Sequence, residues 1–473
     1  MGARLSRPAR PLAAVRAGRK ARRSRRLFPP LAFQPCDHGG THYRLQTRHG
    51  RHVGGEIPAP DARGRTFPRT LERTRCPVTR LPMKDRFSLP EGMIYLDGNS
   101  LGPLPVGTAE KVQDVVQAQW GAHLIKGWNL DGWMAQPTRV GNRIARLIGA
   151  PEGTITMGDT LSVKVFQALS AALKMRPDRR VILSDSGNFP SDLYMAEGLI
   201  QQLGQGYELR IVAPEDVASA MTDDVAVAMI TQVDYRTGRM HDMAQVTAAA
   251  HGAGAVMLWD LAHSAGAVPV DVAGCNAEFA VGCTYKYLNG GPGAPAFIYA
   301  RPDIVADIQP ALAGWLGHDA PFAFEAGYRP AAGIERMRVG TPPVIQMTAL
   351  EHALGLWDEV DMAELRERSV ALSELFIALV AEKCPELVLA SPRDANQRGS
   401  QVSFASKNGY AVMQALIARD VIGDFRAPDI MRFGFTPLYI DEGDVRGAVD
   451  ILADILATRS WDRPEYHQKR DVT

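Results

Sequence analysis

Lys286 lies where a short apolar segment meets a glycine-rich turn, within Gly282–Gly293. Lysines are rarely buried unless they are paired or functional. A desolvated lysine amine has a lowered pKa and becomes a usable nucleophile, and the glycines let the backbone turn tightly around it. For an isolated lysine, a solvated side chain beside a turn is the alternative. The glycine spacing does not fit GxGxxG, and no ribose-binding acid follows in a strand–turn–helix unit, which excludes a dinucleotide site.

Asp260 ends another apolar segment, and His263 follows three residues later. Taken separately, Asp260 could cap a helix and His263 could be a surface or core histidine. An acid at the end of one strand and a lysine after the next strand together describe a pyridoxal 5'-phosphate (PLP) site. There the carboxylate keeps the pyridine nitrogen protonated and the lysine forms a Schiff base with the aldehyde. We therefore predict PLP as the cofactor, with Lys286 and Asp260 as catalytic residues.

Two further segments fit such a site. In Gly187–Asp192, Phe189 can stack on a flat cofactor ring and Asp192 can hydrogen-bond to its substituents. The alternative is a turn in which Ser191 or Asp192 caps the next helix, and both interpretations can hold together. Asp159–Ser162 opens a predicted helix, whose first N–H groups suit the cofactor phosphate.

The elements that must position these residues alternate between strands and helices. This alternation predicts an α/β fold with a mostly parallel sheet covered on both faces, and ligands then bind at the carboxyl ends of the strands. The expected strands are 181–183, 209–212, 225–230, 256–259 and 296–299, and the expected helices include 161–174 and 192–202.

Beyond about residue 343 the pattern predicts a second, smaller α+β domain. Asp361 followed by Glu364 makes an aspartate variant of the capping box before a helix that runs to Lys383. Strands are expected at 401–404 and 430–435, and a final helix at 442–458. The expected division is an extension at 1–82, a large PLP-binding domain at 83–345 and a small domain at 346–473.

Charge and cysteine usage limit the possible partners. Lys and Arg total 53 against 52 Asp and Glu, which gives no reason to expect a nucleic-acid or membrane partner. Five dispersed cysteines without a CxxC pair fit a reducing cytoplasm. No apolar run approaches the roughly 20 residues of a membrane-spanning helix. We expect a soluble cytoplasmic protein without a metal site.

The arginine-rich extension at residues 1–82 has no hydrophobic periodicity and is expected to be disordered. A translation start further in, for instance at Met83, would make it an artefact. A transit peptide and a basic nucleic-acid arm are the functional alternatives.

Several motifs, in order along residues 88–455, resemble the kynureninase family. They are Ile94–Gly102, Asn188–Asp192, Trp259–Gly266, Tyr285–Gly293, Gly314–His318, Gly340–Pro343, Val421–Arg426 and Arg432–Phe433. The resemblance implies a PLP-dependent transferase of fold type I that acts as a homodimer. It implies hydrolysis of L-kynurenine, or 3-hydroxykynurenine, to L-alanine and anthranilate or 3-hydroxyanthranilate, in tryptophan catabolism and NAD biosynthesis.

The resemblance also implies roles for individual residues. Lys286, Tyr285 and Asp260 are the catalytic set, with Tyr285 as the candidate general acid. The cofactor-binding set is Leu161, Ser162, Phe189, Pro190, Ser191, Asp192, Thr231, Asp260, His263, Tyr285, Lys286, Trp315 and Thr341, of which Trp315 and Thr341 reach the cofactor from the neighbouring subunit. The substrate-binding set is Arg432, Asn99, Ser100, Trp128 and His318. Arg432 suits the α-carboxylate because a guanidinium can bind it bidentately.

Alternatives remain at several points. Trp128 and Trp315 could be packing aromatics, and Asn99–Gly102 could be only a turn. Another PLP enzyme of the same fold, such as a cysteine desulfurase or class V aminotransferase, is the nearest rival, although Cys384 in an expected helical hairpin is a poor reactive cysteine. A non-catalytic PLP- or ligand-binding protein is the rival from another class. Thr341 favours kynurenine over the hydroxylated substrate, since an asparagine variant accompanies the latter in the family.

Overall fold

The computed structural model describes residues 81–469, so the expected extension at residues 1–82 lies almost wholly outside the described residues. Its central feature is a seven-stranded sheet with the order β2-β8-β7-β6-β5-β3-β4. Strands β4, β3, β5, β6 and β7 are parallel, and β8 is antiparallel to both of its neighbours. The bounds are β2 Ile155–Met157, β3 Val181–Asp185, β4 Glu208–Val212, β5 Val225–Thr231, β6 Val256–Asp260, β7 Phe279–Gly282 and β8 Phe297–Ala300.

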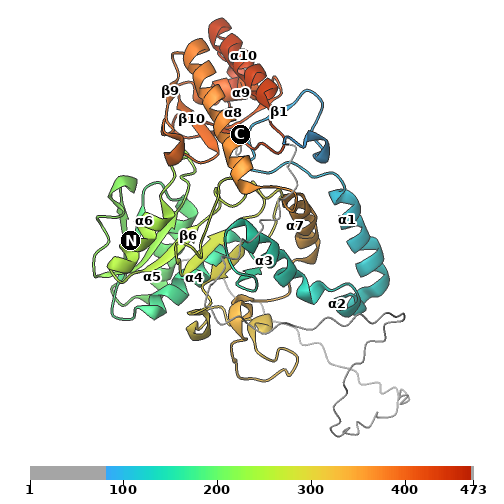
Figure 1. Cartoon of the computed structure of the whole chain (residues 1–473), viewed down its shortest axis with the longest axis vertical. Coiled ribbons are helices and arrows are strands. Elements are labelled where there is room, and N and C mark those ends of the chain that lie inside the picture. The colour runs from blue at the N-terminus through green and yellow to red at the C-terminus, as the bar shows by residue number, and fades with distance from the viewer. Residues whose placement is uncertain (1–80, 470–473) are drawn as a thin grey trace, which may run out of the picture. The chain divides into compact units, whose positions relative to one another are not determined.

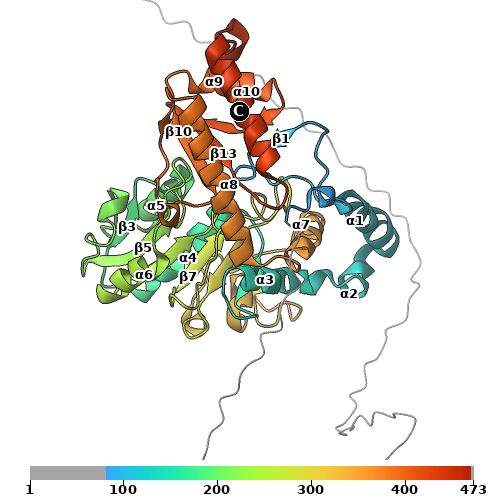
Figure 2. The same ribbon diagram turned by 45° about the horizontal axis from the view of Figure 1, so that its top comes forward.

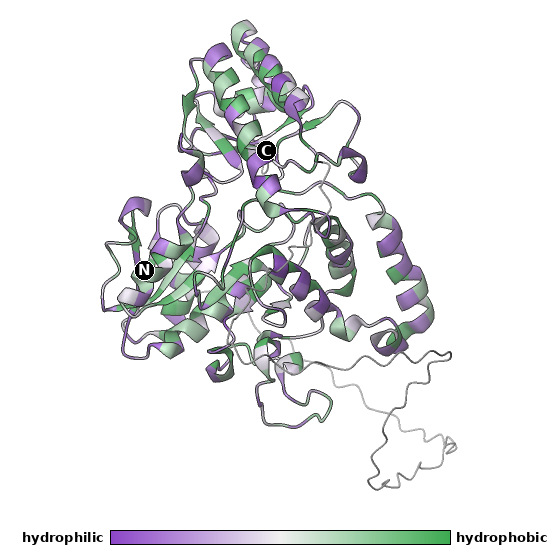
Figure 3. Ribbon diagram, in the orientation of Figure 1, coloured by the Kyte–Doolittle hydropathy of each residue, from purple (hydrophilic) through white to green (hydrophobic). Residues whose placement is uncertain are grey.

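The inner strands are apolar along their whole length because both faces of the sheet are covered. In β5, Val227 and Met229 belong to the apolar cluster on one face, and Ala228 and Ile230 to the cluster on the other. Figure 3 shows the central sheet predominantly in the green of hydrophobic residues. Within the described residues, no helix is both long and apolar enough to cross a membrane.

Helices cover this sheet as Figure 1 shows. Helix α4 packs against α5 and against β5, β6 and β7, whereas α6 packs against β6 and α3 against β2 and α7. The bounds are α3 Gln136–Leu147, α4 Leu161–Met175, α5 Pro190–Leu203, α6 Met243–Gly252 and α7 Val344–Trp357. The expected mostly parallel α/β fold is confirmed.

A second, smaller sheet is antiparallel and has four strands in the order β12-β13-β10-β9. Helix α8 packs on β10 and α9 on β13, while α10 packs on α8 and α9 (Figure 2). Phe376 of α8 contacts Phe433 and Phe435 with ring centroids 5.0 and 5.2 Å apart. The bounds are α8 Met362–Lys383, β9 Val388–Leu389, β10 Gln401–Ala405, α9 Gly409–Ile417, β11 Val421–Ile422, β12 Asp424–Arg426, β13 Ile430–Gly434 and α10 Glu442–Thr458.

The helix caps of this part only partly follow expectation. Asp361 caps α8 by accepting from the N–H groups of Ala363 and Glu364. The return bond from the Glu364 side chain is not formed, so the capping box predicted there is incomplete. A complete capping box joins Asp441 and Asp444 at the start of α10. Helix α7, which begins at Val344, packs on α1 and α3, whereas α8 packs on α10. The expected domain boundary between residues 345 and 346 stays a prediction.

The segment before α3 connects the two sheets. β1 (Ile94–Tyr95) pairs in parallel with β11 beside the smaller sheet. The N–H of Gly102 then donates to the carbonyl of Tyr285, at 2.8 Å, in the loop after β7. The chain continues through α1 (Thr108–Asp114) and α2 (Gly127–Leu130).

Candidate functional site

A pocket of about 260 Å³ lies at the carboxyl ends of β3, β5, β6 and β7. This is where a parallel sheet is expected to bind its ligand. It brings together most of the predicted cofactor site, and it is lined by Leu161, Ser162, Phe189, Ser191, Asp192, Thr231, Asp260, His263, Tyr285 and Lys286. It is also lined by Thr160, Ala262 and Tyr235, which the sequence analysis did not select.

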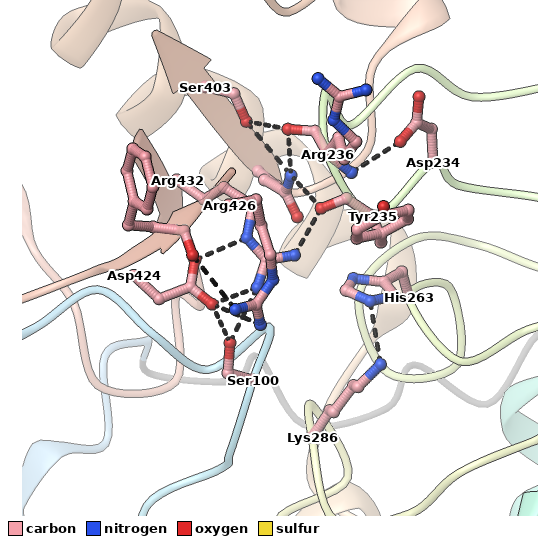
Figure 4. Close-up of polar contacts among 12 residues, drawn as sticks. Ser100, Asp234, Tyr235, Arg236, His263, Lys286, Ser403, Asp424, Arg426 and Arg432 are labelled. Carbon is pink, nitrogen blue, oxygen red and sulfur yellow. Dashed lines mark hydrogen bonds and ion pairs between the residues drawn. The ribbon is translucent and has the colours of Figure 1, made fainter. Parts of the chain in front are cut away.

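Lys286 is half-buried in this pocket, and its Nζ lies 2.9 Å from Nε2 of His263 (Figure 4). Burial, and next the nearby charge of Lys286, hold the pKa of His263 well below 6.5. The imidazole is therefore neutral, and one ring nitrogen can accept an N–H from the lysine. Its Nδ1 is buried without a hydrogen-bond partner.

Two carboxyl groups face the same space. Asp260 is the last residue of β6. Its carboxylate accepts hydrogen bonds from the N–H of Ala262 at 2.9 Å and from the hydroxyl of Thr231 at 3.4 Å. Burial raises the pKa of Asp260 to about 6, although the charge of Lys286 acts in the opposite direction. The pKa of Asp192 is raised well above 3.8, first by burial and then by the charge of Asp260.

The unpartnered atoms of this pocket fit PLP. Both carboxylate oxygens of Asp192 are buried without a hydrogen-bond partner, as is Nδ1 of His263. Buried polar atoms in folded proteins are normally hydrogen-bonded, so these atoms require a ligand that carries donors and acceptors. A protonated pyridine ring with polar substituents is such a ligand, and the Lys286 amine is placed to bind its aldehyde.

The N-termini of two helices meet at one end of the pocket. α4 begins at Leu161 and α5 at Pro190, and the hydroxyls of Ser162 and Ser191 lie 2.9 Å apart. The first N–H groups of a helix have no intrahelical acceptor and attract anions. The pair of helix ends can therefore hold a phosphate. The alternative in which Ser191 or Asp192 caps α5 is wrong, because the helix starts at the preceding proline and its N-cap is Phe189.

The exposed ring of Phe189 borders the pocket, with Lys286 Nζ 6.0 Å from its centroid. The ring of Tyr235 meets it edge to face, with centroids 5.0 Å apart. Tyr235 was missed by the sequence analysis, although its place shortly after the carboxyl end of β5 could have indicated it. It lies in the loop between β5 and α6, and its carbonyl accepts a hydrogen bond from Arg432.

Arg432 lies in β13 and is buried, 1% exposed. Its Nε and Nη2 bind the carboxylate of Asp424, Nη2 also donates to Ser100 Oγ at 3.0 Å, and Nη1 donates to the carbonyl of Tyr235. Figure 4 shows this cluster beside His263 and Lys286. The guanidinium fork is thus filled by Asp424 within the chain, which the sequence analysis did not foresee.

The remaining predicted residues lie elsewhere in the chain. Trp128 and Trp315 line a second pocket of about 340 Å³, and His318 lines a third with Trp315. Thr341 is exposed. None of these four lines the pocket that contains Lys286.

Two further predicted residues are placed by packing. The side-chain amide of Asn99 is buried and lies against Gly434. A Cβ added to Gly434 would lie only 2.2 Å from Asn99 Oδ1. Pro190 is the first residue of α5 and does not itself line the pocket. Among the described residues, no cluster of His, Cys, Asp and Glu could hold a metal ion.

Comparisons with known proteins bear on this geometry. Residues 365–452 match the family model of the kynureninase C-terminal domain. The chain is 51% identical over 399 residues to the kynureninase of Burkholderia pseudomallei strain 1106a, covering 83% of this chain and 96% of that protein. The chain belongs to the kynureninase family. It is also 49% identical over 399 residues to the kynureninase of Pseudomonas fluorescens, with the same coverage.

Solved structures show the same fold. A cysteine desulfurase from Thermococcus onnurineus NA1 superimposes with a TM-score of 0.68 at 16% identity, covering 80% of this chain and 99% of that one. The cysteine desulfurase CsdA from Escherichia coli gives 0.67 at 20% identity, covering 79% and 98%. The expected fold type I is confirmed, and as a kynureninase-family protein the chain is a PLP-dependent enzyme.

Proposed function

We propose that this kynureninase-family enzyme hydrolyses L-kynurenine to anthranilate and L-alanine with PLP bound at Lys286. The observation that carries the proposal is one pocket that holds an amine, two buried carboxyl groups and two helix N-termini. The kynureninases at 51% and 49% identity support the substrate.

The residues of the pocket supply the remaining chemistry. PLP, when bound, acts as an electron sink for the pair of electrons left at Cα after proton removal. Lys286 takes up the α-proton as a free amine, and Asp260 holds the proton on the ring nitrogen. Water adds to the γ-carbonyl, and cleavage of the Cβ–Cγ bond releases anthranilate. The electron pair of that bond stays at Cβ, and protonation there completes L-alanine. Burial raises the pKa of Tyr285, which keeps its hydroxyl protonated and able to donate a proton as general acid.

The other pocket residues hold the cofactor in this proposal. The hydroxyls of Ser162 and Ser191 and the first N–H groups of α4 bind the phosphate. Asp192 and His263 hydrogen-bond to ring substituents, while Phe189 stacks on the ring face. Arg432, with Ser100 beside it, contributes to recognition of the substrate α-carboxylate through the one Nη1 N–H that its partners within the chain leave.

We further propose a homodimer in which Trp315 and Thr341 complete the site of the neighbouring subunit, with Trp128, His318 and Asn99 shaping the substrate pocket. Large apolar side chains are exposed around Trp315, a feature typical of protein interfaces. They are Ile125 and Phe322, which line a pocket with Trp315, and Phe324, whose ring stacks on that of Trp315. Trp120, Leu124 and Leu130, which flank Ile125 in the chain, are also exposed. Burial of this surface by a second copy accounts for their exposure in one chain.

The cysteine desulfurase alternative lacks a suitable thiol among the described residues. Cys384 ends α8, is fully buried, and is followed by β9, so the helical hairpin expected around it is wrong. Burial raises the pKa of Cys384 to about 11, and burial likewise raises the pKa of Cys275 and Cys283. A thiol with a raised pKa is a poor nucleophile because little thiolate is present near pH 7.

The test compares turnover of L-kynurenine and 3-hydroxykynurenine by purified, PLP-loaded enzyme, followed by product fluorescence. We expect turnover of both, with kynurenine preferred because of Thr341, and we place the enzyme in cytoplasmic tryptophan catabolism and NAD biosynthesis as part of this proposal. Lys286→Ala should abolish turnover and the covalent link that borohydride traps. Normal turnover by that variant, or wild-type release of alanine from cysteine instead, would overturn the proposal.

A further inference from the structure

Arg432 has few donors left for a ligand. A guanidinium carries five N–H groups. Two are directed at the Asp424 carboxylate, one at Ser100 Oγ and one at the carbonyl of Tyr235. One N–H of Nη1 remains, so the buried arginine cannot bind a substrate carboxylate through its fork while Asp424 occupies it.

A second arginine shares the same counter-ion. Nη2 of Arg426 lies 2.8 Å from Oδ2 of Asp424, the same oxygen that Arg432 binds. The Arg426 side chain is 34% exposed, whereas those of Arg432 and Asp424 are each 1% exposed. The charges of both arginines also act on Asp97, whose pKa is raised to about 7, first by burial and then by the charge of Asp424. Near pH 7 two guanidinium groups thus meet the carboxylate of Asp424 and a partly protonated Asp97, and the accessible positive charge is that of Arg426.

Arg426 lies close enough to the PLP pocket for its charge to act on residues there, although neither Arg426 nor Arg432 lines the pocket. Its charge acts electrostatically on His263, Tyr285 and Tyr235, which all line that pocket. In Figure 4 it lies next to Arg432, across from Tyr235 and His263. Because the Arg426 side chain is partly exposed and that of Arg432 is buried, an anion near these residues can reach the guanidinium of Arg426 more readily.

We propose that Arg426 is a second carboxylate-binding residue of the substrate site. The α-carboxylate of the amino acid is held between Arg426 and the remaining Nη1 N–H of Arg432, with Asp424 as the shared counter-ion that fixes both guanidinium groups. This proposal rests on the proposed function only in requiring an amino-acid substrate. It explains why an arginine that is already neutralised by Asp424 can still belong to an anion site.

The test measures binding rather than turnover. L-Alanine and ethylamine are each titrated into PLP-loaded enzyme, and the change in cofactor absorbance gives an apparent dissociation constant. The two amines differ in the carboxylate that Arg426 is proposed to bind. Arg426→Gln should raise the constant for L-alanine about tenfold or more, as expected for loss of a charge-assisted hydrogen bond, and leave that for ethylamine unchanged.

Two further variants make the result decisive. Arg419 also pairs with an aspartate, Asp454, and its side chain is 42% exposed, so Arg419→Gln is the matched control and should change neither constant. Arg426→Lys keeps a positive charge opposite Asp424, so it serves as the test if the glutamine variant does not fold. It should weaken the binding of L-alanine and leave the binding of ethylamine unchanged. An equal effect on both amines, or none on L-alanine, overturns the proposal. Failure to turn over kynurenine leaves this measurement intact and overturns only the proposed function.

Discussion

Lys164 is a buried charge that the proposed reaction does not use. It lies in α4 with its side chain 0% exposed, and its Nζ contacts Gln167 Oε1 at 3.0 Å and Asp159 Oδ2 at 3.5 Å. Burial lowers the pKa of Lys164 from 10.5 to about 8, although Asp159 acts to raise it. The folded state therefore disfavours the ammonium form.

The size of this effect follows from the pKa. A tenfold change in proton affinity is worth about 1.4 kcal/mol, so the charged lysine costs the folded state about 3 kcal/mol at pH 7. Lys164→Met keeps a similar length and removes the charge. It also loses the hydrogen bond to Gln167, worth about 1 kcal/mol, while the partly exposed Asp159 can be solvated. We expect the variant to be more stable by about 2 kcal/mol.

The pH dependence has a definite sign. Between about pH 8 and 10.5 the unfolded chain keeps the Lys164 proton and the folded chain has lost it. The free energy of unfolding of the wild type therefore rises with pH in this window. The advantage of Lys164→Met should be full below about pH 8 and should disappear by about pH 10.

The assay is denaturant unfolding of both PLP-loaded proteins, followed by tryptophan fluorescence, at about pH 7 and about pH 10. Lys383, an exposed lysine paired with Asp450, gives the control variant Lys383→Met, which should leave stability nearly unchanged at either pH because exposed ion pairs contribute little. A Lys164→Met variant that is less stable than wild type at pH 7, or a difference that does not vary with pH, refutes the reasoning.

Three further substitutions test the site. Gly102→Ala places a Cβ 2.3 Å from the backbone oxygen of Lys286, and it should cost about 1–3 kcal/mol and weaken PLP binding in a fluorescence titration. Gly252→Ala is its control, because a Cβ at Gly252 would meet no atom within 4 Å, and it should neither destabilise the protein nor weaken PLP binding. Asp424→Asn leaves the buried Arg432 without a counter-ion and should lower the free energy of unfolding by about 3–5 kcal/mol; a loss below about 1 kcal/mol contradicts the buried pair. Arg432→Lys should raise KM for kynurenine more than it lowers kcat, and unchanged kinetics remove it from the site.

The sequence was most informative where local pattern and chemistry coincide. Apolar runs marked the buried parallel strands, and helix α10 has the predicted bounds of Glu442–Thr458. Asp260 and Lys286 could be paired in advance because strand ends of a parallel sheet meet at one edge. The short β2 and β1, by contrast, have too few residues to show a period.

The polar cluster around Arg432 was not predictable in the same way. Its partners Tyr235, Ser100 and Asp424 come from three separate parts of the fold. Neither periodicity nor a spacing rule specifies that a carbonyl in a loop after β5 accepts from β13. The sequence showed a guanidinium suited to a carboxylate, but only the packed structure shows that a carboxylate of the chain already occupies it.

Residues 94–102 join the smaller sheet to the lysine loop. β1 is hydrogen-bonded to β11, and Gly102 is hydrogen-bonded to the residue that precedes Lys286. A rotation of the smaller sheet, which carries Arg432, must therefore move the reactive amine with it or break the Gly102–Tyr285 bond. A shift of the residues that bind the substrate carboxylate would thus be transmitted through residues 94–102 to the amine that takes up the α-proton.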